Sequence, residues 1–127
     1  METISDIVVY ENGEIELKIS ADKDTIWASI NDIAKVFDID RSVVSKHINN
    51  IFKDNELDEK VVCANFAHTT KHGSLSDKTQ TRDIKYYNLD IVLAVGYRTS
   101  STKAIHFRQW ASSVLKNYIQ NGYVINT

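Results

Sequence analysis

The sequence predicts an α+β fold: a winged helix-turn-helix-like domain with an N-terminal β-hairpin and two C-terminal helices. Three observations lead to this prediction. Two strand-like segments open the chain, two adjacent amphipathic segments with a short break follow them, and a second pair of strands encloses a polar loop. Because 127 residues suit one compact core, we expect residues 1–127 to form a single domain.

The first element is a β-hairpin over residues 7–19. Apolar and charged residues alternate over residues 15–19, so the second strand has one buried face and one face in water. Between the strands, Asn12 and Gly13 accept the positive φ angles of a tight turn. A short third strand is expected at residues 25–27.

Residues 29–52 match a helix-turn-helix by position. Ser29 is placed to cap the first helix and Asp40 to cap the second. Ala34 supplies the small residue that is needed where the two helices cross. Asp38 stands in the turn where glycine is usual, and Asp tolerates a left-handed backbone better than most residues. The residues expected on the inner face of the second helix are Val44, Ile48 and Ile51.

The outward face of this second helix carries side chains of the types that read DNA bases. Arg can bind a guanine edge, Asn an adenine edge, and Ser either. No acidic residue occurs from Arg41 to Lys53, whereas a helix that only faces solvent more often mixes both signs. The predicted base-contacting residues are Arg41, Ser42, Ser45, Lys46 and Asn49. The alternative is a solvated amphipathic helix in some other helical pair.

A wing-like hairpin is expected over residues 61–87, with strands at residues 61–67 and 84–87 and a polar loop between them. Phosphate contacts position a protein on DNA without reading its sequence. The cations of this loop that we expect to make such contacts are Lys71, Lys78 and Arg82. The alternative is a loop that is polar merely because it is exposed, and the residues alone do not decide between the two.

A pair of helices is expected over residues 88–121. Asn88 is placed to cap the first helix, and Ser101 or Thr102 starts the second, longer one. The candidates for secondary phosphate contacts near the turn between these helices are Arg98, Lys103 and Arg108. The alternative for the two arginines is a structural role, in which they bind carbonyl oxygens or pair with the acidic N-terminal part of the chain.

The net charge of −2 hides a division along the chain. Residues 1–40 carry a net charge of −7, and residues 41–127 carry +5. The low overall charge argues against nonspecific binding of polyanions, but a polarised molecule can still present one basic face to nucleic acid.

Few residues point to catalysis or to a bound cofactor. Cys63 is the only cysteine, and a zinc set formed by it with His68 and His72 lacks a fourth ligand at a usual spacing. The chain has no glycine-rich phosphate loop and no spaced pair of carboxylates, so we expect no enzymatic activity, no metal and no cofactor. The longest apolar run, residues 91–95, is too short to cross a membrane, and the N-terminus is not a secretory signal, so we expect a cytoplasmic protein.

Several segments carry a resemblance to a known family. The segment Tyr86–Asn126 contains the runs GYR and FRQWA in that order, and His47–Glu59 reads HINNIFKDNELDE. With the N-terminal hairpin and Trp27, these segments make nearly the whole chain similar to the virulence RhuM family of bacterial proteins. The resemblance implies a mobile-element or pathogenicity-island setting and a DNA-binding-like domain at the start of a longer protein. It implies no catalytic residues.

The function that we expect is binding of double-stranded DNA, as a targeting or transcription-regulating module. One helix-turn-helix gives modest affinity, so a homodimer on two half-sites is expected, with Ile105 and Ile119 of the long helix on the dimer surface. A downstream domain or a protein partner is also expected. The alternative is a protein-interaction or adaptor module of a toxin–antitoxin or defence-type system, in which residues 1–40 contact a basic partner.

Overall fold

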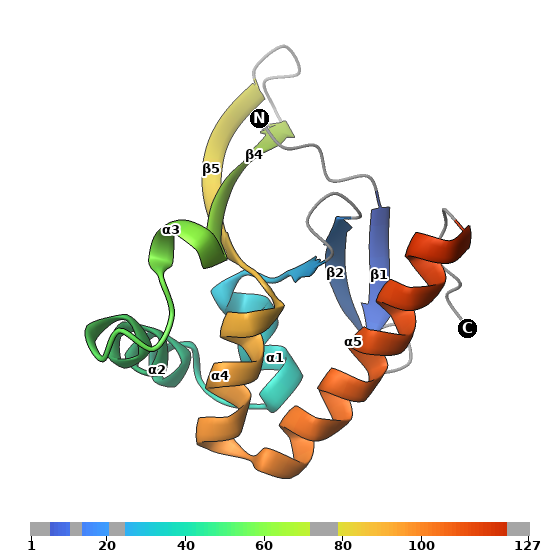
Figure 1. Ribbon diagram of the computed structural model, residues 1–127. Coiled ribbons are helices and arrows are strands. Elements are labelled where there is room, and N and C mark those ends of the chain that lie inside the picture. The colour runs from blue at the N-terminus through green and yellow to red at the C-terminus, as the bar shows by residue number, and fades with distance from the viewer. Residues whose placement is uncertain (1–5, 11–13, 21–24, 72–78, 122–127) are drawn as a thin grey trace.

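The computed structural model describes residues 6–10, 14–20, 25–71 and 79–121, with the backbone alone for residues 6, 66–71, 79–82 and 121. This part of the chain is α+β and contains a three-stranded sheet, a long two-stranded hairpin and several helices (Figure 1). The elements in chain order are β1 (Asp6–Tyr10), β2 (Ile15–Ser20), β3 (Thr25–Trp27), α1 (Ile30–Phe37), α2 (Arg41–Lys53), α3 (Glu59–Val62), β4 (Cys63–Lys71), β5 (Thr79–Tyr87), α4 (Leu89–Thr99) and α5 (Ser101–Asn121).

The N-terminal strands form an antiparallel sheet in the order β1-β2-β3. Tyr10 pairs with Ile15, so β1 and β2 are neighbours joined by a short connection, as the sequence predicted. Ile15, Leu17 and Ile19 are buried while Glu16 is exposed, which confirms the predicted alternation. The Asn-Gly turn expected at residues 12 and 13 lies outside the described residues.

Local capping defines the first two helices. The Ser29 hydroxyl accepts a hydrogen bond from the Asp32 amide at 3.2 Å, and the Asp32 carboxylate accepts one from the Ser29 amide at 2.9 Å. This reciprocal pair satisfies two amides that the first turn of α1 leaves unpaired. At the other end of α1, Asp38 adopts φ 54° and ψ 52°, the left-handed conformation expected of it. Asp40 then caps α2, so the predicted starts of both helices are confirmed, and α2 ends at Lys53, one residue later than predicted.

The segment after α2 corrects the prediction that a strand begins at residue 61. Val61 and Val62 belong to α3, which is capped by the Asp58 carboxylate accepting from the Lys60 amide at 2.9 Å. Val62 is buried and Val61 is exposed. A pair of valines is equally compatible with a strand, and here the capping aspartate before them determines a helical turn instead.

The hairpin that follows is longer than the sequence suggested. β4 and β5 pair antiparallel from Cys63 opposite Tyr87 to Lys71 opposite Thr79, so most of the stretch expected to be a loop is strand. Threonines recur along both strands, and β-branched residues favour extended backbone even where they are polar. Residues 72–78, between the strands, lie outside the described residues.

The hairpin is joined to the N-terminal sheet at its base. Ala28 and Tyr87 exchange two backbone hydrogen bonds, of 2.9 and 2.8 Å, and the Asn88 amide donates to the Val62 carbonyl at 2.9 Å. Beyond this base, β4 and β5 extend away from the helices as an arm (Figure 1).

The two C-terminal helices complete the core. Asn88 caps α4 by accepting from the Ile91 amide, and α5 begins at Ser101, as predicted. On α5, Phe107 packs against Tyr10 of β1, with their ring centroids 5.0 Å apart, and against Phe37 of α1. The largest fully buried side chains come from the sheet and from several helices, and they include Phe37, Phe107, Leu17, Ile33, Ile51 and Ile91.

No helix among the described residues is both long and apolar enough to cross a bilayer.

Candidate nucleic-acid interface

The buried side of α2 determines which of its side chains face outward. Val44, Ile48 and Ile51 are at most 3% exposed, so one stripe of the helix is fixed against the core. A helical period of 3.6 residues places the opposite stripe at i, i+4, i+7 and i+11. The residues on that stripe are Ser42, Lys46, Asn49 and Lys53, and all four are exposed. We call this the outer face of α2.

Most of the polar side chains on and beside the outer face have no partner within the described part of the molecule. Arg41, Lys46, Asn49 and Lys53 form no hydrogen bond or ion pair with any other described residue. Long cationic side chains without partners keep their donors available to an anionic ligand. Four of the five predicted base-contacting residues are exposed. The fifth, Ser45, is only partly exposed, at the edge of this face.

Ser42 is already engaged at the start of the helix. Its amide donates to the Asp40 carboxylate at 3.0 Å, and its hydroxyl donates to the same oxygen. These two hydrogen bonds, the hydroxyl first, hold the pKa of Asp40 below its ordinary value. The hydroxyl oxygen of Ser42 therefore remains available mainly as an acceptor, and a carboxylate occupies the helix N-terminus where a phosphate could otherwise bind.

His47 lies on the flank of α2 and is partly buried. Burial lowers the pKa of its imidazole, and the charges of Arg98 and Lys46 lower it further. A histidine with a depressed pKa is neutral at pH 7, so His47 adds no positive charge to the outer face.

Three further residues belong to this region although the sequence prediction did not single them out. Lys53 continues the outer stripe, Asn50 is partly exposed beside it, and Val43 is an exposed apolar residue in the first turn. The 3.6-residue period that identified Lys46 and Asn49 would also have identified Lys53. Val43 was missed because an apolar residue next to the buried Val44 is readily taken as part of the core.

The predicted phosphate-binding residues of the hairpin are only partly described. Lys71 is the last residue of β4, and Arg82 lies on β5 opposite His68. The third of these cations, Lys78, lies outside the described residues. Lys71 and Arg82 are therefore on paired strands of the arm rather than in a loop.

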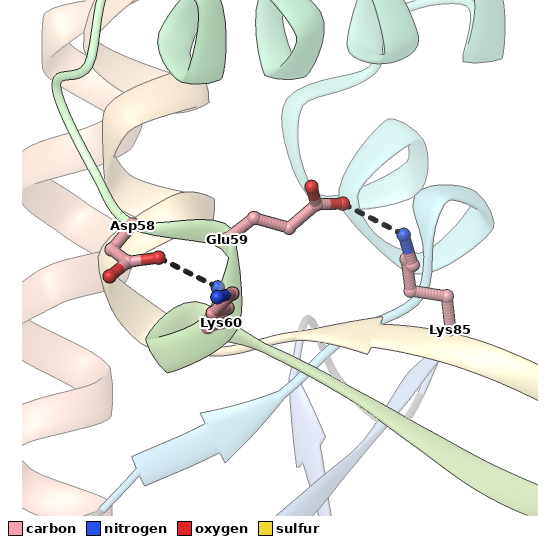
Figure 2. Close-up of polar contacts among 4 residues, drawn as sticks. All are labelled: Asp58, Glu59, Lys60 and Lys85. Carbon is pink, nitrogen blue, oxygen red and sulfur yellow. Dashed lines mark hydrogen bonds and ion pairs between the residues drawn. The ribbon is translucent and has the colours of Figure 1, made fainter.

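An ion pair fixes the base of the arm beside α3. Figure 2 shows the Lys85 ammonium of β5 donating to the Glu59 carboxylate at 2.9 Å, next to the Asp58 cap. This hydrogen bond raises the pKa of Lys85. Both side chains are about half exposed, so the pair orients α3 against β5 more than it stabilises the fold.

The cations near the α4–α5 turn are largely engaged within the chain. The Arg98 guanidinium lies 2.8 Å from the Glu56 carboxylate and 3.9 Å from that of Asp54, in the turn after α2. The Lys103 ammonium donates to the Phe37 carbonyl at 3.3 Å, at the C-terminal end of α1. Arg108 differs from both, because it is exposed and pairs with no other described residue.

Arg98 thus has a structural role, and its acidic partners lie in the turn after α2 rather than in the first 40 residues.

Cys63 does not have the environment of a nucleophile, and the side chains of His68 and His72 lie outside the part of the chain that the structure describes. Burial raises the pKa of its thiol to about 11, so the sulfur stays protonated near neutral pH. Within the described ranges, no three His, Cys, Asp or Glu side chains are arranged to hold a metal ion.

Comparison with known proteins identifies the C-terminal part of the chain. Residues 61–127 match the family model described as the virulence protein RhuM family. The matched region includes β4, β5, α4 and α5 and leaves α1 and α2 outside it. No curated protein and no solved structure matches the chain. Because the family match covers more than half of its residues, the chain belongs to the virulence protein RhuM family.

Proposed function

We propose that this protein binds double-stranded DNA, with α1 and α2 acting as a helix-turn-helix whose second helix enters the major groove. The observation that carries the proposal is the outer face of α2. It is exposed and lacks acidic residues from Arg41 to Lys53, and its cations and Asn49 have no partner elsewhere in the described residues. Side chains of these types are the ones that bind guanine and adenine edges and phosphates.

The connection between the two helices supports this assignment. A helix-turn-helix needs a chain reversal of a few residues with a left-handed position, and Asp38 provides that conformation. The next residue, Ile39, packs against the core, and its amide donates to the Ala34 carbonyl at 3.0 Å. These contacts fix the angle at which α2 leaves α1, so the outer face is held on a rigid support.

The arm formed by β4 and β5 is the proposed wing. In this role Lys71, Lys78 and Arg82 contact the DNA backbone and position α2 without reading sequence. A homodimer on two half-sites supplies the affinity that a single helix-turn-helix lacks, with the exposed Ile105 and Ile119 of α5 at the dimer surface. Such a regulatory or targeting module acts in the cytoplasm, where bacterial DNA lies.

The proposal is tested by selection from a pool of random-sequence duplexes at two salt concentrations. We expect an enriched motif and an affinity that falls steeply as salt is added, because phosphate contacts release counterions. A pool without an enriched motif at either salt concentration contradicts sequence-selective binding.

The second candidate function is binding of a basic protein partner. It is favoured by a cleft of about 420 Å³ between β2 and α1 whose walls include the carboxylates of Glu14, Glu16 and Asp32. Lys18 and Lys35 also line this cleft and offset part of its negative charge, so we rank the candidate second. A protein that selects no DNA motif but loses its partner when Glu14 and Glu16 are both changed to Gln would support it.

A further inference from the structure

Val43 is an exposed apolar side chain among the polar residues of α2. It is 38% exposed, although it directly precedes Val44, which is fully buried. Its amide donates to the Asp40 carbonyl at 3.0 Å, so it lies in the first turn of the helix. Valine is a weaker helix former than Ala, Lys or Glu, so at an exposed position it lowers helix stability with little packing in return.

The neighbours of Val43 place it beside the outer face. Lys46 and Asn50 follow it at i+3 and i+7, and residues at these spacings share a side of a helix. Ser42 precedes it, with a hydroxyl oxygen that remains free to accept. The two methyl groups of Val43 therefore lie next to side chains that can hydrogen-bond to base edges.

The exposed methyl groups of Val43 could pack against only one kind of group in the major groove of DNA. Thymine presents a 5-methyl group there, and no other standard base presents an apolar group in that groove. In a helix-turn-helix, the N-terminal residues of the second helix are the ones that reach base edges, and Val43 is in that turn.

We infer that Val43 is a specificity-determining residue that packs against the 5-methyl group of a thymine under the first turn of α2. The inference rests on the proposed DNA-binding function and adds to it the identity of one recognised base. Its energetic origin is the removal of methyl surface from water on both partners.

The test replaces each thymine of the selected duplex by deoxyuridine, one at a time, which removes only the methyl group. For one position we expect wild-type affinity to fall about threefold to tenfold, the effect of burying one methyl-sized group. The Val43→Ala variant should lose most of this difference at that position, because it lacks the two methyl groups that contact the thymine in this inference. Alanine is the better helix former, so this variant is expected to fold.

Val61→Ala on α3 is the matched control, because Val61 is also an exposed valine but lies off α2. It should remain as sensitive to deoxyuridine as the wild type. If the wild type binds its motif but no deoxyuridine position weakens it, or if Val43→Ala keeps the same sensitivity, the Val43 inference is overturned while the proposed function stands. A selection that yields no motif overturns both.

Discussion

The outer face of α2 and the corner between α4 and α5 both carry cations, but the two regions use them differently. On α2, the side chains of Arg41, Lys46 and Lys53 form no hydrogen bond or ion pair with another described residue. At the corner, Arg98 pairs with Glu56, and Lys103 donates to the last carbonyl of α1. The same residue types therefore stabilise the fold in one region and remain available to a ligand in the other.

The two regions also lie in different halves of the chain, because α2 precedes residue 61 and the corner follows it. The corner lies in the region that matches the family model, and its contacts reach back to α1 and to the turn after α2. α4 packs closely against α1 at Gly96, where an added Cβ atom would lie 2.5 Å from the ring of Phe37. The family-matched region therefore supports α1 and α2 from behind and leaves the outer face of α2 available for the proposed contact with DNA.

The largest expected effect is on DNA affinity. It is measured by comparing a double variant that removes two cations of α2 with a double variant that removes two exposed cations elsewhere. Replacing both Arg41 and Lys46 with Ala should weaken binding to the selected duplex by about 2–4 kcal/mol, because two proposed base contacts and two positive charges are lost. Replacing Lys60 and Lys116 with Ala removes the same charge from exposed positions on α3 and α5 that have no proposed role in DNA binding. Fluorescence anisotropy at fixed salt measures both. Equal losses for the two double variants would mean that overall charge, and not the face of α2, determines binding.

The next effect concerns the close packing at Gly96. Substitution by Ala in a helix normally stabilises it, but here the added methyl group collides with the Phe37 ring and with Ala104. We expect Gly96→Ala to lower the free energy of unfolding by about 1–2 kcal/mol, as measured by urea denaturation. Combining it with Phe37→Leu should cost less than the sum of the two single changes, because the smaller side chain makes room. A Gly96→Ala variant that is more stable than the wild type contradicts this packing.

A smaller effect is expected at Arg98. Arg98→Gln should lower stability by about 0.5–1 kcal/mol, the range for partly exposed ion pairs, and added salt should reduce the difference. In a double-mutant cycle with Glu56→Gln, the second substitution should cost little once the first is made. DNA affinity should change less than about threefold, because a lost phosphate contact would cost more. A large loss of affinity with unchanged stability would place Arg98 on the DNA instead.

The smallest effect concerns pH and His47. Its pKa is lowered in the folded protein, chiefly by burial, so the unfolded chain binds the proton more readily. Stability should therefore be fully present above the ordinary histidine pKa of about 6.5 and should decline as the pH falls below it. Urea denaturation at pH 7.5 and 5.5 measures the decline. His47→Gln should reduce this decline. A decline of the same size in the His47→Gln variant and in the wild type would assign it to other groups.

Much of the fold was predictable because its signals are local. Ser29, Asp40 and Asn88 each cap a helix by accepting a hydrogen bond from a backbone amide two or three residues later, so helix starts follow from short patterns. The left-handed turn at Asp38 was predictable for the same reason. Local chemistry also identified the buried stripe of α2 and, from it, the outward side chains.

The remaining features depend on partners distant in the chain. The length of the β4–β5 arm depends on pairing between the two strands. The polar sequence of residues 68–71, considered alone, predicts a loop. The Arg98–Glu56 pair joins residues 42 positions apart, and no local pattern selects that carboxylate over others. Val43 was overlooked because its exposure depends on how α2 packs against α1 and α4, which the sequence alone does not define.

An NMR titration of the ¹⁵N-labelled protein with the selected duplex tests the claim that DNA contacts the outer face of α2. We expect the amide signals of residues 41–53 to shift or broaden first, with smaller changes in β4, in β5 and near Ile105, Arg108 and Ile119 of α5. Changes confined to α5, or to the strands of the N-terminal sheet, would contradict the claim.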